Sequence, residues 1–500
     1  MNYNHININN KKSERLKILV FLSITIIHFL IVGCKGNAPG GTTTTAFADK
    51  FFCHDTIIEA GWSWSYQAGY YDSNGHYAGG TETLHVLGHK DRLYAANGYW
   101  EDSSNVYYGG SNFNANWAQI LRLDSPDGQW EVDLEMGPTY LRAEILKSVT
   151  FTTDGNGNPL IEPVNLLVAG AWSRTWLWPW SVINTEVTVF VRDDATGNWS
   201  RNTVYTVPGS GSDFSCRFLS VYRDTVTGVD RIFFGIGVKG VWSGVYDPGV
   251  PGKIRWDGHS ESGDVAIRSL AMIEANNSLL FSSGKLIYRR NDGVSPSYTV
   301  VHDMSDLYPG VVDSGIGGIR GMTKIPNPNG AGDSILFAWC PNTSSQSCMY
   351  RLDPDGAGGY TRYKEMCLGD LSANYLSIHV WYVLSAYNDM LPVVDPATSE
   401  TLHIIGVESW TGQNFNPSSK GFYQGGMYAI RSANGAYRVK EVNGRWNGCK
   451  PILVAPRAYT LSPFNGEKDA FIYFGGWDGN NMITHNSAWI FKTSVEEALK

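Results

Sequence analysis

The sequence has little charge, and the charge it has is not basic. Charged residues make up 17% of the 500-residue chain, and 39 Lys and Arg are outnumbered by 47 Asp and Glu, for a formal charge of −8. A nucleic-acid-binding protein needs a basic face to neutralise phosphates, so this balance argues against nucleic acid as a partner. Low charge together with 13% aromatic residues also excludes a disordered chain.

The common signatures of catalysis are also missing. The sequence has no Walker A loop, no HExxH zinc motif and no GxSxG nucleophile elbow. No two of its cysteines form a CxxC metal knuckle. The sequence therefore indicates compartment and fold class better than activity.

Residues 1–33 are predicted to be a targeting segment rather than a domain. Basic residues between positions 11 and 17 precede an apolar run from Ile18 to Val32, which is too short for a comfortable membrane span. The following Ile31-Val32-Gly33-Cys34 resembles the lipobox of bacterial lipoproteins. This resemblance implies that Cys34 is the lipid anchor of an exported protein; the alternative is an ordinary signal peptide with a chance Cys.

The same resemblance implies a location at a membrane. In bacterial lipoproteins an Asp directly after the lipidated Cys tends to retain the protein at the inner membrane, and here that position is Lys35. The outer membrane is therefore expected if the cell is diderm. Residues 34–49, rich in Gly and Thr, are predicted to be a flexible tether, and residues 50–500 the folded domain.

Six cysteines remain after Cys34, an even number that is compatible with disulfides in an exported chain. Cys340 and Cys348 flank a turn-rich loop, which predicts a bridge across a hairpin. Other pairings stay open, because connectivity cannot be read from sequence alone.

A segment recurs along the chain. It begins with a β-rich stretch containing a basic residue, continues through a polar turn and ends in a second apolar strand with small residues, as in Phe471-Ile-Tyr-Phe-Gly-Gly. A further strand, a polar turn and an aromatic residue close the unit, as in residues 120–130. Asp-Gly and Asn-Gly between apolar strands favour hairpins because Gly tolerates positive φ. Each unit is therefore predicted to be a four-stranded antiparallel meander.

The basic residues that open the units recur at a mean spacing of about 60 residues, the length of one blade with variable loops. They are His85, Arg142, Arg217, Arg268, Arg320, His379 and Arg457. Such units resemble the blades of a seven-bladed β-propeller. The resemblance implies an all-β fold in which a strand within residues 51–66 completes the last blade and closes the ring; it matches no named enzyme family.

The repeated basic residues are also the main candidate site. The innermost strands of a propeller surround its axis, so these residues would form a ring near one mouth of the channel. Arginine can hold carboxylate or sulfate bidentately. The predicted ligand-binding residues are Arg142, Arg217, Arg268, Arg320, Arg457 and His379. The structural alternative is that each arginine pairs with a carbonyl or carboxylate of a neighbouring blade.

Aromatic and titratable residues supply further candidates. Trp176 and Trp178 belong to a Trp-rich insertion, predicted to be a loop, whose flat rings suit sugar stacking, although they could equally cover the sheet or meet a partner. His85 and Tyr246 are candidate catalytic acid–base residues, as are His89 and His403. A single His in a strand is, however, more often simply packed and hydrogen-bonded.

Residues Asp154, Asn156 and Asn158 have the alternating oxygen ligands that open a calcium loop. The loop lacks the later Glu and is followed by Pro159, so an ordinary hairpin turn is favoured over a calcium site. No other cofactor is expected.

Three functions fit these features. The first is a lipid-anchored cell-envelope propeller that binds a glycan, a protein or another anionic ligand. The second is a polysaccharide lyase, since several lyase families share the propeller architecture; Arg142 or Arg217 would neutralise a uronate carboxylate while His85 or Tyr246 takes the neighbouring proton. The third is a scaffold subunit of an envelope complex.

Overall fold

The computed structural model describes residues 61–100, 102, 117–177, 181–208, 216–262, 271–307, 318–341, 347–385, 390–411, 423, 425–442, 453–477 and 486–500. The chain divides between Phe51 and Phe52, and every described residue belongs to the second part. Cys34, the targeting segment and the tether lie outside the described residues. Within those residues, no helix is both long and apolar enough to span a bilayer.

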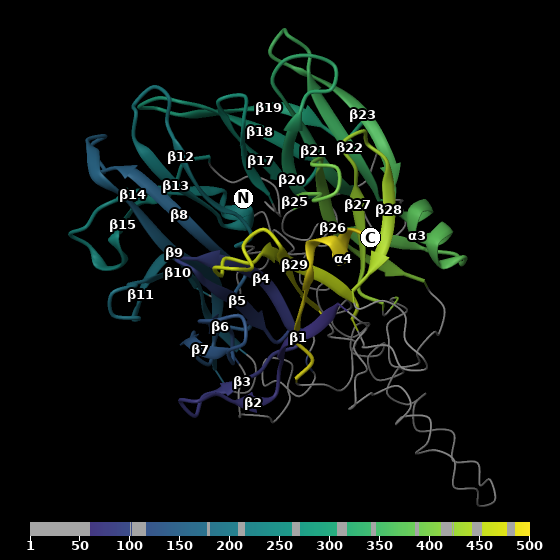
Figure 1. The fold of residues 1–500 in the computed structure, drawn as a ribbon. Helices are drawn as coiled ribbons and strands as arrows, with labels where there is room; N and C mark the ends of the chain where they lie inside the picture. The colour runs from purple at the N-terminus through teal and green to yellow at the C-terminus, as the bar shows by residue number, and fades with distance from the viewer. Residues whose placement is uncertain are drawn as a thin grey trace, which may run out of the picture. The chain divides into compact units, whose positions relative to one another are not determined.

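Antiparallel strands make up most of the described chain, and the fold is all-β and propeller-like (Figure 1). Four sheets are four-stranded meanders in which neighbours in sequence are neighbours in the sheet. Their strands are β8 (Ile145–Thr153), β9 (Pro159–Leu177), β10 (Ser181–Arg192) and β11 (Trp199–Pro208); β12 (Leu219–Arg223), β13 (Asp230–Gly235), β14 (Val241–Tyr246) and β15 (Ile254–Ser260); β16 (Met272–Ala275), β17 (Ser278–Ser283), β18 (Leu286–Asn291) and β19 (Ser297–Asp303); and β20 (Gly318–Pro326), β21 (Asp333–Cys340), β22 (Cys348–Pro354) and β23 (Tyr360–Cys367).

An eight-stranded sheet joins the beginning and the end of the described chain. Its strands are β1 (Trp62–Gln67), β4 (Glu82–His89), β5 (Arg92–Gly98), β6 (Gln119–Leu123), β7 (Glu131–Glu135), β29 (Ala455–Leu461), β30 (Phe471–Trp477) and β31 (Trp489–Ser494). Trp62 of β1 lies opposite Thr493 of β31, and Trp477 of β30 lies opposite Glu82 of β4. The predicted N-terminal strand thus pairs with the last unit.

The remaining sheet has an interrupted first strand. Both β24 (Tyr382–Ser385) and β25 (Leu391–Val394) pair with β26 (Thr401–Trp410), which continues to β27 (Met427–Arg431) and β28 (Tyr437–Glu441). A small hairpin, β2 (Tyr70–Tyr71) and β3 (Tyr77–Ala78), follows β1.

Two helices were not anticipated from the sequence: α3 (Leu368–Leu376) and α4 (Val495–Leu499). The Ser494 hydroxyl caps α4 by accepting from the backbone N–H of Glu497. The Tyr428 hydroxyl of β27 donates to the Ala498 carbonyl at 2.8 Å, so the end of the chain is tied to the preceding sheet.

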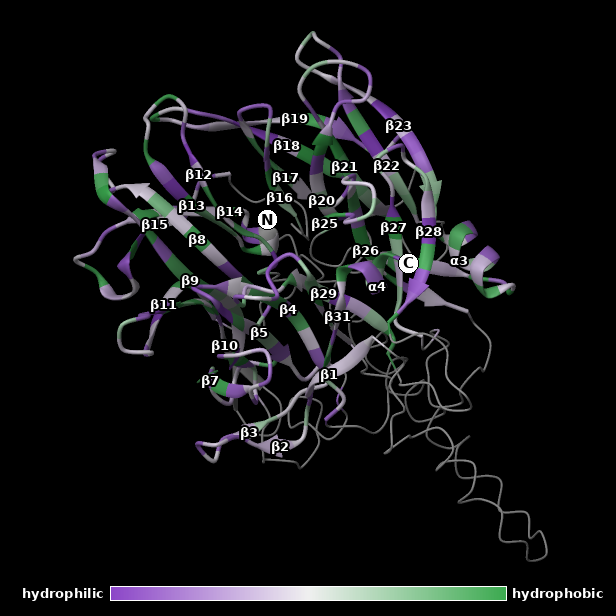
Figure 2. Cartoon of the chain, viewed as in Figure 1, coloured by the Kyte–Doolittle hydropathy of each residue, from purple (hydrophilic) through white to green (hydrophobic). Residues whose placement is uncertain are grey.

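Apolar cores lie between consecutive sheets. Strands such as β21 and β30 are buried along nearly their whole length, whereas β8 alternates buried and exposed residues, and the turns are largely hydrophilic (Figure 2). In one core, Ile145 and Val168 of the β8–β11 sheet pack with Ile232 and Phe234 of the β12–β15 sheet. Val86 of the first unit likewise shares a core with residues of the last, including Ala458, Tyr473 and Ile490. The sheets are therefore held to one another by burial of their faces.

Glycines within the second strands allow this close packing. A Cβ atom at Gly170 of β9 would lie 2.7 Å from Ile145 and 2.8 Å from Phe234. At Gly406 of β26 it would lie 1.9 Å from the Pro456 carbonyl oxygen of the next unit. Only glycine permits such approaches, which accounts for the small residues at the end of the repeated segment.

Two local predictions were wrong. The disulfide joins Cys348 to Cys367, not to Cys340, because β22 and β23 place Cys348 opposite Cys367 in their antiparallel ladder, with Cα atoms 4.1 Å apart. Cys340 is a buried free thiol. The Trp-rich segment is not a loop up to Leu177: Trp172 and Trp176 belong to the 19-residue strand β9, which forms a long hairpin with β10.

Candidate functional site: a buried charge chain beside a cavity

Acidic and basic side chains alternate from one unit to the next, on or just before strands β4, β8, β12, β26 and β29. Glu82, the first residue of β4, accepts through Oε2 from Arg142 Nη2 at 3.2 Å and from Arg457 Nη1 of β29 at 2.8 Å. Arg142 Nε also lies 2.6 Å from Glu82 Oε1 as an ion pair. Arg142 also approaches Glu144 at 3.5 Å, and Arg217 Nε lies 3.8 Å from Glu144. Because Arg142, Arg217 and Arg457 pair with carboxylates, they follow the structural alternative considered for the repeated arginines.

The chain continues to a third carboxylate and is covered by aromatic rings. Glu408 of β26 approaches Arg457 Nη2 at 3.3 Å. The guanidinium of Arg142 lies over the Trp100 ring at 4.9 Å, and that of Arg457 over Trp477 at 4.8 Å. The six charged residues, hereafter the inner charge chain, are all buried and comprise three carboxylates and three guanidiniums: Glu82, Arg142, Glu144, Arg217, Glu408 and Arg457. Their formal charges balance.

Glu144 is ionised despite complete burial. Burial by itself raises its pKa, but Arg217, Arg142, the backbone N–H of Cys216 and a hydrogen bond from Trp172 together lower the pKa below its usual value. The Cys216 N–H donates to Glu144 Oε2 at 3.1 Å. Burial and the Glu144 charge raise the pKa of the Cys216 thiol well above its usual value, so this cysteine is an unreactive thiol.

One cavity of about 170 Å³ lies beside this chain, among strands from four units. Its lining includes His85 of β4, Lys147 of β8, Leu391 of β25, and Arg457 and Tyr459 of β29. The Nε2–H of His85 donates to the Glu144 carbonyl oxygen at 2.9 Å, which makes Nδ1 the basic nitrogen of the neutral ring. Three basic side chains and no carboxylate are among the described residues that line the cavity.

The other predicted site residues lie elsewhere. Arg320 of β20 is fully buried, and His379 is exposed after α3, with its ring against Trp381 at 4.7 Å. Tyr246 ends β14 within an apolar core, where its ring packs 5.7 Å from Phe151, so the structure does not bring it to His85. Arg268, Trp178 and the side chain of Trp176 lie outside what is described.

The segment from Asp154 to Asn158 forms the turn between β8 and β9. Asp154 Oδ1 accepts from the backbone N–H groups of Asn156 and Asn158, and its Oδ2 accepts from the Asn158 amide at 2.9 Å. These bonds hold the pKa of Asp154 below its usual value. Both carboxylate oxygens of Asp154 therefore form hydrogen bonds within the turn. In the described residues, no group of three or more His, Cys, Asp or Glu side chains could hold a metal ion.

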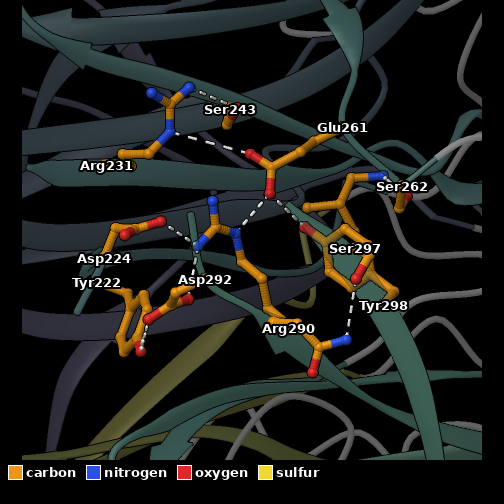
Figure 3. A network of polar contacts seen from close by, with 12 residues as sticks. Tyr222, Asp224, Arg231, Ser243, Glu261, Ser262, Arg290, Asp292, Ser297 and Tyr298 are labelled. Atoms are coloured by element: carbon orange, nitrogen blue, oxygen red, sulfur yellow. Dashed lines mark hydrogen bonds and ion pairs between the residues drawn. The ribbon is translucent and has the colours of Figure 1, made fainter. Parts of the chain in front are cut away.

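Sequence reasoning missed a second set of arginines, on the third strands of the units. Arg290 of β18 donates to Glu261 through Nε and to Asp224 and Asp292 through Nη1, at 2.7 and 2.6 Å, and Tyr298 donates to Glu261 (Figure 3). Asp224 and Glu261 belong to the β12–β15 unit, so Arg290 connects two units.

The same arrangement recurs on other third strands. Arg192 of β10 donates to Asp133 of β7 at 2.7 Å, and Arg431 of β27 donates bidentately to Glu365 of β23. We call the sets around Arg192, Arg290 and Arg431 the outer clusters. The signal was present in the sequence, because Val189-Phe-Val-Arg-Asp and Met427-Tyr-Ala-Ile-Arg both belong to the third-strand recurrence.

Comparisons with known proteins identify no family. No family model matches the chain, and no curated protein matches it. Among solved structures, the chain is similar to a mutant α-L-arabinofuranosidase from Fusarium graminearum bound to an iminosugar inhibitor, at 10% identity and TM-score 0.42 over 88% of this chain and 99% of that one. A Trypanosoma rangeli sialidase in complex with sialic acid matches at 8% identity and TM-score 0.33, over 76% of this chain and 58% of that one.

Proposed function

We propose that this protein binds an acidic sugar unit of a glycan in the cavity that lies beside the inner charge chain. The observation that carries the proposal is the lining: His85, Lys147 and Arg457 converge from three different strands. A carboxylated or sulfated sugar offers an anion to the cationic Lys147 and Arg457 and hydroxyls to His85 and the neighbouring polar atoms. The small volume, about 170 Å³, suits one sugar unit rather than an extended chain.

The proposal also covers the location of the protein in the cell and the fold of its domain. The chain is exported, anchored through a lipid on Cys34 at a membrane, the outer one in a diderm cell, and tethered by residues 34–49. The domain of residues 50–500 is a closed seven-bladed propeller. The pairing of β1 with β31 and the core shared between the first and last units support ring closure.

Calorimetry on the full chain tests the ligand. The protein is held in a detergent without sugar groups and titrated with glucuronate or galacturonate oligomers and with neutral glucose oligomers. Lys147→Met keeps the apolar stem and removes the charge, so it should weaken uronate binding about tenfold, the value of one charge-assisted hydrogen bond. Lys324→Met on β20 is the matched control. Equal binding of acidic and neutral oligomers, or an unchanged affinity in Lys147→Met, would contradict the proposal.

A second function is favoured by the position of His85 in the same cavity as Arg457. In a polysaccharide lyase, a cation neutralises the uronate carboxylate while a base removes the adjacent proton. His85 would be that base through Nδ1, with Arg457 as the neutralising group. The product is unsaturated and absorbs ultraviolet light. An absorbance rise with uronate polymers that disappears in His85→Gln would establish the lyase; binding without a rise would leave the protein a recognition module.

A further inference from the structure

A separate group of polar residues joins the first two units outside the cavity. His89, the last residue of β4, points its Nδ1 at the Ser148 hydroxyl of β8, at 2.8 Å. Its Nε2 lies 3.0 Å from Asp194 Oδ2, in the turn between β10 and β11. The three residues are separated by 59 and 105 positions in sequence and come together only in the fold.

The three side chains differ in how far they are exposed to solvent. The His89 side chain is fully buried, Asp194 is mostly buried, and Ser148 is exposed to solvent. A hydroxyl that solvent can reach, bonded to a buried imidazole that a carboxylate orients, is the arrangement of a nucleophile, a general base and a positioning group. Such a site is recognised by geometry and roles rather than by order in the chain.

The hydrogen-bond partners of His89 determine which of its ring nitrogens carries the proton. Asp194 also accepts from Lys90 at 2.6 Å and from Arg192 at 2.9 Å, and despite the opposing effect of burial these contacts and His89 lower the pKa of Asp194 to about 2. An ionised Asp194 accepts the Nε2–H of His89, so Nδ1 carries the lone pair that faces Ser148. The hydroxyl of Ser148 can therefore donate to His89.

His89 is neutral at neutral pH. Burial lowers its pKa below the usual value, and Lys90 and Arg192 lower it further, while Asp194 raises it. The Tyr94 ring of β5 packs edge-on against the imidazole at 6.0 Å. The basic form of His89 therefore persists into mildly acidic solution.

We propose that Ser148, His89 and Asp194 form a second site, which hydrolyses carboxylic esters with a short acyl group. Ser148 is the nucleophile, His89 is the general base and Asp194 is a positioning residue. The neighbours that hydrogen-bond around Ser148 are polar: the Asn165 amide lies 3.2 Å from Ser148 Oγ and donates to the Thr150 hydroxyl at 2.9 Å. These surroundings suit an acetyl group better than a long acyl chain. The inference is independent of the ligand proposed for the cavity.

The reaction balances without any added cofactor. The Ser148 proton passes to His89 Nδ1 as Oγ bonds to the ester carbonyl carbon. The carbon–oxygen bond to the alcohol breaks, and the alcohol leaves with the proton from His89. Water then gives a proton to His89 and its oxygen to the acyl carbon, and Ser148 regains its hydrogen as the carboxylic acid departs.

Covalent labelling of the full chain in detergent tests the site. A fluorophosphonate should form one adduct at Ser148, located by peptide mass spectrometry, with loss of fluoride, and p-nitrophenyl acetate should be hydrolysed. Ser148→Ala should abolish both, and His89→Gln should slow both about 100-fold or more. Thr203→Val, which removes an exposed hydroxyl of β11, is the matched control and should leave both rates unchanged.

The pH profile distinguishes catalysis from a structural contact. The wild-type labelling rate should fall on acidification only as pH drops through the lowered pKa of His89, because protonated His89 cannot accept the Ser148 proton. Asp194→Asn removes the charge that raises the pKa of His89, so the acid limb should move to still lower pH while the maximal rate falls about tenfold or more.

Three results would overturn the proposal. One is a folded wild-type protein with no adduct at Ser148. Another is labelling that His89→Gln does not slow, which would make Ser148 merely an exposed hydroxyl. The last is an adduct without any hydrolysis of p-nitrophenyl acetate. Thermal unfolding of each variant, compared with Thr203→Val, separates these outcomes from misfolding.

Discussion

The inner charge chain and the outer clusters both tie neighbouring units together, but with different geometry. In the outer clusters one arginine is held tightly by several acceptors, as Arg290 is by Asp224, Glu261 and Asp292. In the inner chain, carboxylates such as Glu82 are shared between two arginines, and some contacts are as long as 3.5 and 3.8 Å. The inner charge chain borders the cavity through Arg457.

We infer from this difference that the outer clusters stabilise the fold, whereas the inner charge chain contributes to ligand binding. Short, multiple hydrogen bonds to one guanidinium fully satisfy it, so an outer cluster is a rigid connection between units. In the inner charge chain, Arg457 also lines the cavity, so a change there affects a bound ligand directly. We therefore expect changes in the outer clusters to affect stability most, and changes at the cavity to affect binding.

Arg290→Met should produce the largest loss of stability. It removes the cation but keeps an apolar stem, and it leaves Asp224, Glu261 and Asp292 close together without their shared partner. The free energy of unfolding should fall by about 5 kcal/mol, the upper end for breaking a buried ion pair. Urea unfolding followed by tryptophan fluorescence measures it. A loss below about 1 kcal/mol would remove the distinction drawn between the two regions.

Glu82→Gln should cost less, about 3 kcal/mol. The amide keeps the shape and can still accept one hydrogen bond, but Arg142 and Arg457 lose the charge between them. The same unfolding measurement applies. Glu186→Gln, at the partly exposed pair with Arg201, is the matched control. If Glu82→Gln proves more damaging than Arg290→Met, the inner chain, not the outer clusters, holds the units together.

Acidification should weaken an outer cluster first through His403 of β26. Burial and the nearby Arg431 lower the pKa of His403 to about 4, whereas the unfolded residue titrates near 6.5. Between these values the unfolded state binds the extra proton, so the free energy of unfolding falls as pH drops from about 6.5 to about 4. Melting temperatures of wild type and His403→Gln at pH 7 and pH 4.5 test this. The variant should lose less stability on acidification; equal losses would contradict the assignment.

Arg201→Ala should have the smallest effect. The pair that Arg201 forms with Glu186 on the neighbouring strand, at 3.0 Å, is largely exposed at the arginine. Solvent-exposed ion pairs contribute about 0–1 kcal/mol. The change in unfolding free energy should lie within that range and vanish in high salt. A larger loss would show that interstrand position, rather than burial, sets the strength of these pairs.

The strand order could be predicted from local signals. Asp-Gly and Asn-Gly turns between alternating apolar residues identified the meanders, and the repeated segments match real strands: residues 92–96 lie in β5, residues 120–123 in β6 and residues 471–476 in β30. Hairpin neighbours are close in sequence, so the turn chemistry is enough to pair them. The repeated small residues were visible in the sequence, but their close approach to neighbouring sheets was shown only by the structure.

The partners of the repeated arginines could not be predicted. Arg457 and Glu82 are 375 positions apart, and Arg142 and Glu82 are 60 apart, so composition does not relate them. The Cys348–Cys367 bridge required the register of two strands, which a one-residue slip would change. The residues that line the cavity come from four strands that are far apart in sequence. His85 and Arg457 were among the predicted site residues, but Lys147 was not.

The β-meander units follow from the sequence, because strand and turn preferences act between residues a few positions apart. The sequence also carries the lipobox-like segment on which the predicted export rests. The contacts of the arginines with carboxylates, the cavity that His85 shares with Lys147, and the position of His89 between Ser148 and Asp194 follow from the fold alone. These contacts depend on the packing of one sheet against the next, and that packing is set by the summed burial of whole sheet faces rather than by any local motif.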